Sequence, residues 1–166
     1  DLHSFPTRRS SDLHIDHRGA PFSQEQLRGR PSLVFFGFTN CPHICPTTLS
    51  KLVQVKRESG IHDLRVILVS VDPERDTPAA LAAYLGSFDA EFVGLTGDKR
   101  VIEGLAKDLN VAMARTEQPG GTYTMDHTAA VFLVDARGAL VAVFTQPIES
   151  PDLAADLRGV ASRLTG

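Results

Sequence analysis

The strongest constraint on the fold of this chain is an apolar run that leads into a pair of cysteines. Residues 32–38 are almost continuously apolar, which is typical of a central strand buried on both faces of a sheet. Cys41 and Cys45, the two cysteines of the chain, follow directly. If both lie in the first turn of the next helix, their i, i+4 spacing places both sulfurs on one helix face. The sequence therefore predicts two neighbouring thiols where a buried strand turns into a helix.

Strand-like and helix-like segments alternate along the rest of the chain. Residues 14–22, with a Gly-containing turn, predict a short hairpin, and residues 116–124, with Pro-Gly-Gly, predict an exposed loop. Further strands are expected over 64–71, 92–96, 111–114, 129–134 and 140–144, and helices over 46–58, 79–88, 98–109 and 151–164. This order predicts an α/β, thioredoxin-like fold, in which helices flank a central mixed β-sheet and an N-terminal β-hairpin precedes it.

Single residues predict several boundaries of these elements. Gly60 and Asn110 are expected just after the ends of two helices. Asp76 or Thr77 is expected to cap the helix that has Pro78 in its first turn. The acidic segment before that helix is therefore interpreted first as a turn and a cap.

Length and composition favour one domain with a sizeable core. The 166 residues are 42% hydrophobic and carry a formal net charge of −3. Because the charges are mixed and no basic stripe occurs, we expect no nucleic-acid partner. No apolar stretch reaches the roughly 18 residues that a membrane-spanning helix requires.

Residues 1–13 are interpreted as a non-native leader, so that a single domain occupies residues 14–166. The leader has no periodicity and resembles a sequencing-adapter oligonucleotide translated in frame. The alternative is a genuine flexible terminus. If the leader is foreign, the native N-terminus lies outside this sequence, and its targeting cannot be inferred from these residues.

The cysteine pair permits redox chemistry or metal binding. The positive end of a helix dipole stabilises thiolate over thiol, which predicts lowered pKa values for thiols at a helix N-terminus. Pro42 and Pro46 restrict the backbone around the pair. Two thiolates suit Cu(I) or another thiophilic ion, whereas a structural zinc site would require four ligands. The alternative is that both cysteines are small buried hydrophobic residues.

His127 is the leading candidate for a third metal ligand. It follows a Gly-rich loop and precedes a predicted strand, although a lone histidine is often structural. His43 lies between the cysteines and is expected to face solvent. Met113 and Met125 are possible soft ligands, but single methionines usually fill gaps in a core.

Three segments of the chain resemble the signatures of one protein family. They are FGFTNCPHICP, SVDPERDTP and DHTAAVFLVD, and in this order and spacing they resemble the Sco/SenC family of copper chaperones. The resemblance runs from about residue 14 to the C-terminus. It implies a thioredoxin-like domain, usually tethered to the membrane by an N-terminal helix and facing the periplasm or the mitochondrial intermembrane space. It also implies a role in assembling the CuA centre of cytochrome c oxidase.

The resemblance implies a specific set of site residues and partners. Copper would be bound by Cys41, Cys45 and His127, and Asp72 would occupy an acidic position that shapes or presents the site. This chain departs from the family pattern at His43, where an acidic residue is frequent. The implied partners are subunit II of cytochrome c oxidase or another cuproprotein, and other copper chaperones. The implied location is the periplasmic side of a bacterial inner membrane, with the anchor absent from this sequence.

Two rival functions remain compatible with the same residues. In a thiol-disulfide oxidoreductase, Cys41 would attack the substrate and Cys45 would resolve the mixed disulfide. A copper or redox sensor would use the same site to detect copper or a change in redox state. His127 discriminates between a chaperone and a thiol exchanger. A dithiol exchanger does not require this histidine, whereas a chaperone should lose its metal without it. The sequence thus leaves open whether the protein is an enzyme.

Overall fold

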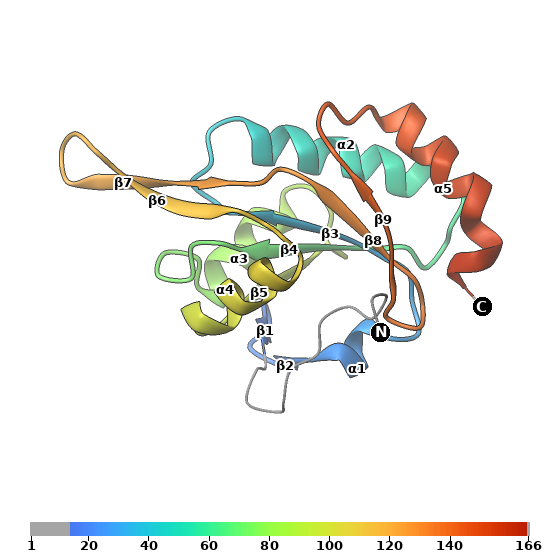
Figure 1. Cartoon of the computed structure of the whole chain (residues 1–166), viewed down its shortest axis with the longest axis horizontal. Helices are drawn as coiled ribbons and strands as arrows, with labels where there is room; N and C mark the ends of the chain where they lie inside the picture. The colour runs from blue at the N-terminus through green and yellow to red at the C-terminus, as the bar shows by residue number, and fades with distance from the viewer. Residues whose placement is uncertain (1–13, 166) are drawn as a thin grey trace.

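A seven-stranded mixed sheet forms the centre of the computed structural model, which describes residues 14–165 (Figure 1). The strand order is β2-β1-β5-β4-β3-β8-β9. Strands β3, β4 and β5 are mutually parallel, and the other neighbouring pairs in this sheet are antiparallel. The bounds are β1 His14–Asp16, β2 Pro21–Phe22, β3 Ser32–Gly37, β4 Arg65–Ser70, β5 Val93–Thr96, β8 Val131–Val134 and β9 Leu140–Phe144.

Helices cover both faces of this sheet. Helices α2 and α5 lie side by side on one face, and α3 and α4 lie on the other (Figure 1). The bounds are α1 Gln24–Leu27, α2 Ile44–Glu58, α3 Pro78–Gly86, α4 Lys99–Asp108 and α5 Ser150–Leu164. Within the described residues, no helix has the length and apolar character needed to cross a membrane. The predicted α/β architecture, with its mixed sheet and N-terminal hairpin, is confirmed; residues 1–13 lie outside the described part.

The first parallel strands are buried because helices cover both of their faces. Every residue of β3 and β4 is buried, and β3 lies between β4 and β8 in the sheet. The continuous apolar run over 32–38 is therefore a central strand, as predicted. The cysteine segment follows β3 at the carboxyl edge of the sheet and leads directly into α2.

Glycine and capping signals set several boundaries correctly. Gly60 and Asn110 both adopt positive φ, of 70° and 58°, just after α2 and α4. Thr77 caps α3, since its side chain accepts a hydrogen bond from the Ala80 backbone N–H. Helix α1 was not predicted, although Ser23 and Gln26 form a capping box around its single turn.

The predicted exposed loop over 116–124 is wrong, because most of it is a β-hairpin. Strands β6, Met113–Gln118, and β7, Thr122–His127, form a separate two-stranded antiparallel sheet. Gly120 and Gly121, both at positive φ, make the turn between them. The strand predicted over 111–114 covers only the start of β6, and the rest was missed because most residues of β6 are exposed and polar. The hairpin extends well beyond the seven-stranded sheet (Figure 1).

Candidate metal centre

The two cysteines occupy different structural positions at the end of β3. Cys45 is the second residue of α2 and is fully buried. Cys41 precedes the helix in a turn, where its N–H donates to the Phe38 carbonyl, and its exposed fraction is 9%. The expectation that both cysteines share the first helical turn is therefore wrong, but both are free thiols facing the same place. Pro46 lies in the first turn of α2, where a proline costs no intrahelical hydrogen bond, and Pro42 is exposed before the helix.

His127 reaches the cysteines from the last residue of β7. Its Nε2 lies 3.5 Å from the Cys45 Sγ. The ligand atoms of Cys41, Cys45 and His127 all lie within 4.8 Å of one another. Among the described residues, this is the one group of three or more His, Cys, Asp or Glu side chains with a metal-binding arrangement. The structure thus brings the three predicted ligands together, with His127 at the end of β7 rather than at the start of β8.

Two aromatic rings and one carbonyl orient the His127 imidazole. Phe35 and Phe38 make edge contacts with it, at centroid distances of 6.1 and 5.8 Å. The Nδ1 lies 3.2 Å from the Thr128 carbonyl oxygen, which can accept a hydrogen bond only from a ring that carries its proton on Nδ1. That tautomer leaves a lone pair on Nε2, the nitrogen that faces Cys45.

Burial shifts the pKa values of two members of the group. It lowers the pKa of His127, against weaker opposing effects from the Thr128 carbonyl and the Asp126 charge, so the neutral imidazole is favoured. It raises the pKa of the Cys45 thiol, more than the Phe38 backbone hydrogen bond lowers it. The predicted lowering of the thiol pKa by the helix N-terminus is therefore wrong for Cys45, because desolvation by burial is the largest cause of its pKa shift.

Gly37 gives the Cys45 sulfur the space that it occupies. A Cβ atom at position 37 would lie 2.9 Å from that sulfur, closer than real contacts of this kind. Sequence reasoning did not single out this residue. The available signal was a glycine inside an otherwise bulky apolar strand, which often marks a close approach.

The loop between β4 and α3 lies beside the metal centre without supplying a ligand atom to it. Asp72 is 3% exposed and accepts a hydrogen bond from the Tyr123 hydroxyl on β7. Asp76 is fully buried and accepts from Thr39 and Ser70, so it is not the cap of α3. The supporting role predicted for Asp72 stays a prediction, now with a defined contact.

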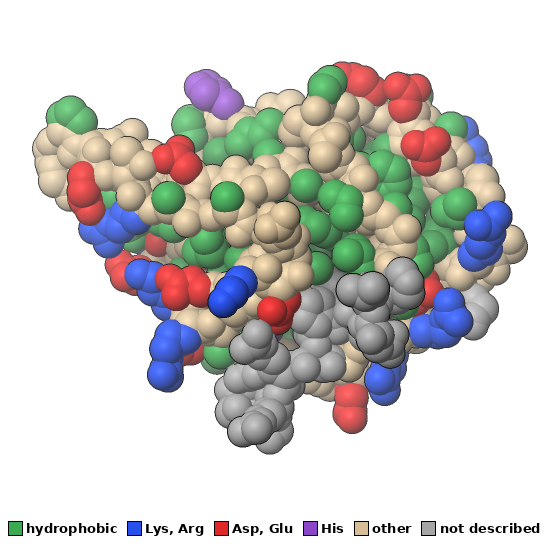
Figure 2. All heavy atoms as spheres, in the orientation of Figure 1, with side chains coloured by type: hydrophobic (Ala, Val, Ile, Leu, Met, Phe, Trp, Pro, Cys, Tyr) green, Lys and Arg blue, Asp and Glu red, His purple; other side chains and the backbone are tan. Residues whose placement is uncertain are grey.

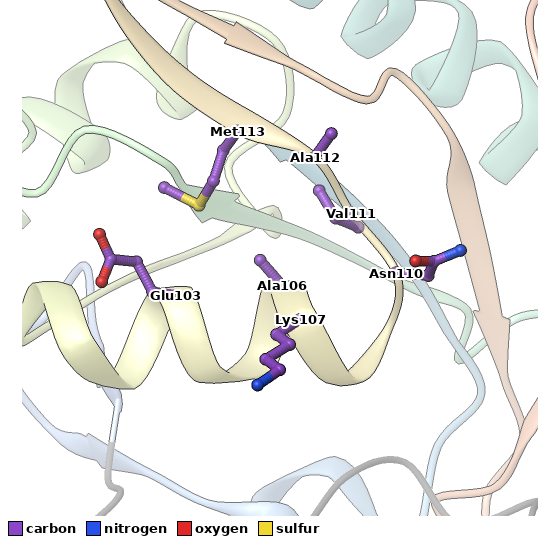
Figure 3. A pocket seen from close by; sticks show the side chains of 7 residues that line it. All are labelled: Glu103, Ala106, Lys107, Asn110, Val111, Ala112 and Met113. Atoms are coloured by element: carbon purple, nitrogen blue, oxygen red, sulfur yellow. The ribbon is translucent and has the colours of Figure 1, made fainter.

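The other candidate ligands have surroundings of their own. His43 is exposed at the N-terminus of α2, as predicted. Met125 packs against the hydrophobic core. Met113 lines a hollow of about 410 Å³ between α4 and the start of β6, together with Glu103 and Lys107 (Figure 3).

The donor set fits a thiophilic ion. Two thiols and one imidazole are soft or borderline ligands, which favour copper or zinc over magnesium or calcium. A closed structural zinc site takes four ligands, and this group offers three. A four-coordinate ion held by these three residues would have one position left for an incoming ligand.

A family model described as SCO1/SenC matches residues 11–162. The chain is 38% identical over 128 residues to the SCO2-like protein of Rickettsia felis, covering 75% of this chain and 62% of that protein. The chain thus spans less than two thirds of the length of that relative.

Two solved structures share the architecture. The structure of Bradyrhizobium japonicum ScoI with copper bound is 39% identical, with a TM-score of 0.80, and the match covers 89% of this chain and 95% of that one. The crystal structure of Arabidopsis thaliana ScoI with copper bound is 29% identical, with a TM-score of 0.85 and coverage of 91% and 96%. Both are thioredoxin-like copper-bound proteins that this chain is similar to.

Proposed function

This chain belongs to the SCO1/SenC family, and from that premise we propose that it is a metallochaperone that binds copper through Cys41, Cys45 and His127. The observation that carries the proposal is the convergence of three soft ligand atoms within 4.8 Å from segments about eighty residues apart. The copper-bound relatives support the choice of metal.

Copper is the cargo, and the protein's residues hold and release it by ligand exchange. On loading, the Cys41 and Cys45 thiols each give up a proton, and the neutral His127 supplies its Nε2 lone pair. An acceptor thiolate enters at the open position and displaces the protein ligands in turn. The Cys41 and Cys45 thiolates then take up one proton each, and His127 is released as the neutral imidazole. The partly exposed Cys41 is the first of the thiolates that an acceptor can approach.

We further propose that the acceptor is the CuA centre in subunit II of cytochrome c oxidase or another cuproprotein, and that the protein works tethered on the periplasmic side of the inner membrane. The three sequence segments that resemble the family support this destination. Transfer to a reduced CuA domain, followed by its visible absorption, tests the acceptor. Fractionation of cells that express the gene with its native upstream sequence tests the location.

Copper titration of single variants tests the binding proposal. We expect one copper ion per wild-type protein, loss of tight binding in Cys41→Ala and Cys45→Ala, and at least about tenfold weaker binding in His127→Ala. His43→Ala is the matched control, because this histidine is exposed and outside the group. Unchanged stoichiometry and affinity in all three ligand variants would refute the proposal.

A thiol-disulfide oxidoreductase is the second candidate, favoured by the unequal exposure of the two free thiols. Cys41 keeps 9% of its surface exposed, so it would be the thiol that attacks a substrate disulfide, and the fully buried Cys45 would resolve the mixed disulfide. A Cys45→Ala variant should then trap the mixed disulfide, and His127→Ala should keep the exchange rate. A sensor would use the same three residues, and binding measurements alone do not separate sensing from delivery.

A further inference from the structure

We propose that Tyr123 is a positioning residue that fixes His127 over the cysteine pair, through contacts with Asp72 and Arg75 on the loop between β4 and α3. The inference rests on the proposed function, because the position of His127 matters most if it binds copper. It assigns a role to the segment 72–76, which supplies no ligand.

The hairpin that carries His127 needs such an anchor. Strands β6 and β7 pair with each other, and within the described residues they form a sheet separate from the seven-stranded one. Because side chains alternate along a strand, Tyr123, Met125 and His127 share one face of β7. On this face Met125 packs against the core and His127 meets Cys45. Tyr123 lies on the same face near the start of β7, and His127 lies at its end.

Tyr123 is held from several directions. Its hydroxyl donates to the Asp72 Oδ1 at 2.8 Å, and its carbonyl accepts from the Arg75 Nη1 at 3.0 Å. The guanidinium carbons of Arg75 and Arg115 both lie 3.7 Å from the centroid of its ring. Arg75 in turn forms an ion pair with Asp72. A buried carboxylate and two cations thus fix one tyrosine of β7.

The far end of the same loop holds the cysteine segment. The buried carboxylate of Asp76 accepts hydrogen bonds from the backbone N–H and the hydroxyl of Thr39, two residues before Cys41. It also accepts from the Ser70 hydroxyl at the end of β4. The loop over 72–76 therefore contacts both halves of the metal centre, the cysteine segment through Asp76 and the histidine strand through Asp72.

The contacts act on His127 through the strand and not through the ion. Tyr123 and His127 are four positions apart along an extended strand, roughly 13 Å at the usual rise. Tyr123 therefore does not touch the metal, and a change there alters binding only by changing where the imidazole sits. Because Tyr123 and His127 are separated in this way, a double-mutant cycle of the two residues can test whether Tyr123 acts through His127.

The test is Tyr123→Phe, which removes the hydrogen bond to Asp72 and keeps the ring between the two guanidinium groups. We expect copper affinity to fall about three- to tenfold, the loss typical of one such hydrogen bond, with weaker nitrogen hyperfine coupling in the Cu(II) spectrum. In the His127→Ala background the same change should have no further effect on affinity. In the copper-free protein, the proton resonances of the His127 imidazole should also shift, because their chemical shifts depend on where the ring lies relative to Phe35 and Phe38.

Ser87→Ala is the control. It removes one side-chain hydrogen bond, from the Ser87 hydroxyl to the Tyr84 carbonyl, that involves neither the hairpin nor the 72–76 loop, and it should leave affinity and spectra unchanged. Wild-type affinity and imidazole resonances in Tyr123→Phe would overturn the inference, as would a loss of equal size in the His127→Ala background. If the wild-type protein binds no copper, the proposed function fails instead, while the imidazole resonances still test whether Tyr123 positions His127.

Discussion

Cys45 can hold its sulfur in place only because residue 37 has no side chain. In Gly37→Ala the new Cβ would meet the Cys45 sulfur at 2.9 Å, and that sulfur is the end of a short rotatable side chain. We expect the sulfur to turn away from His127, weakening copper binding about tenfold and destabilising the fold by about 1 to 3 kcal/mol. Calorimetric copper titration and chemical unfolding measure the two effects.

Gly94→Ala separates crowding from ligand displacement. A Cβ at position 94 would also meet its nearest neighbour at 2.9 Å, but that neighbour is Leu85, on the α3 side of the sheet. The control should lose comparable stability and keep wild-type copper affinity. Equal affinities in the two variants would show that Gly37 is only a packing residue.

The His127 imidazole makes the stability of the metal-free domain depend on pH. Its pKa is lowered by burial from the ordinary 6.5, so the unfolded chain takes up its proton first as the pH falls. This contribution to stability is fully present above about pH 6.5 and is lost as the pH falls through the lower folded-state pKa. Thermal unfolding of the copper-free protein from pH 7.5 to 5 should therefore show a steeper decline in Tm for the wild type than for His127→Gln. Parallel declines would contradict the assigned burial effect.

The ligand residues could be predicted from the sequence, but the residues that position them could not. Cysteine and histidine carry their chemistry in their identity, so spacing and a family resemblance were enough to nominate the three. Gly37 and Tyr123 matter through what lies next to them in space, and those neighbours are distant in the sequence. The pKa of Cys45 was predicted in the wrong direction for the same reason, because its burial depends on the whole fold.

At the scale of elements, the connection from β4 to α3 does more than cap a helix. Asp76 satisfies three donors of Thr39 and Ser70 in a buried setting, whereas Thr77 caps α3 at the surface. Asp76→Ala should therefore cost about 2 to 4 kcal/mol, since it leaves buried donors without a partner. Thr77→Ala should cost only about 1 kcal/mol. Urea unfolding of both variants measures the difference, and equal losses would show that the buried carboxylate is not needed.

Elements with a buried face were predictable, and the β6–β7 hairpin was not. The central strands can be predicted from the sequence because both of their faces are apolar, as over 32–38. The hairpin has exposed charged and polar residues on β6 and a Pro-Gly-Gly turn, a composition that also fits a loop. Its contacts with the 72–76 loop join residues about fifty positions apart, so the sequence alone does not show them.

At the scale of the whole molecule, charges of both signs occur on the face in Figure 2. Acidic and basic side chains are interspersed along its lower edge, and several acidic side chains gather at its upper right. The distinctive feature is instead the metal centre, where a hairpin outside the main sheet meets the start of α2. An ion bound there would join the hairpin to the start of α2, because His127 ends β7 and Cys45 lies in the first turn of α2.

Copper should therefore stabilise the folded domain as a whole. Since the three ligands converge only in the native state, the gain follows mass action and amounts to about 2.7 kcal/mol when free copper is 100 times its dissociation constant. We expect Tm of the reduced protein to rise with copper and to return when a chelator removes it. His127→Ala should keep part of the rise, because two thiolates remain, and Cys45→Ala should lose it. Oxidation of Cys41 and Cys45 to a disulfide should abolish the rise, because the disulfide sulfurs can no longer act as thiolate ligands. A copper-induced rise that survives oxidation would place the binding site elsewhere.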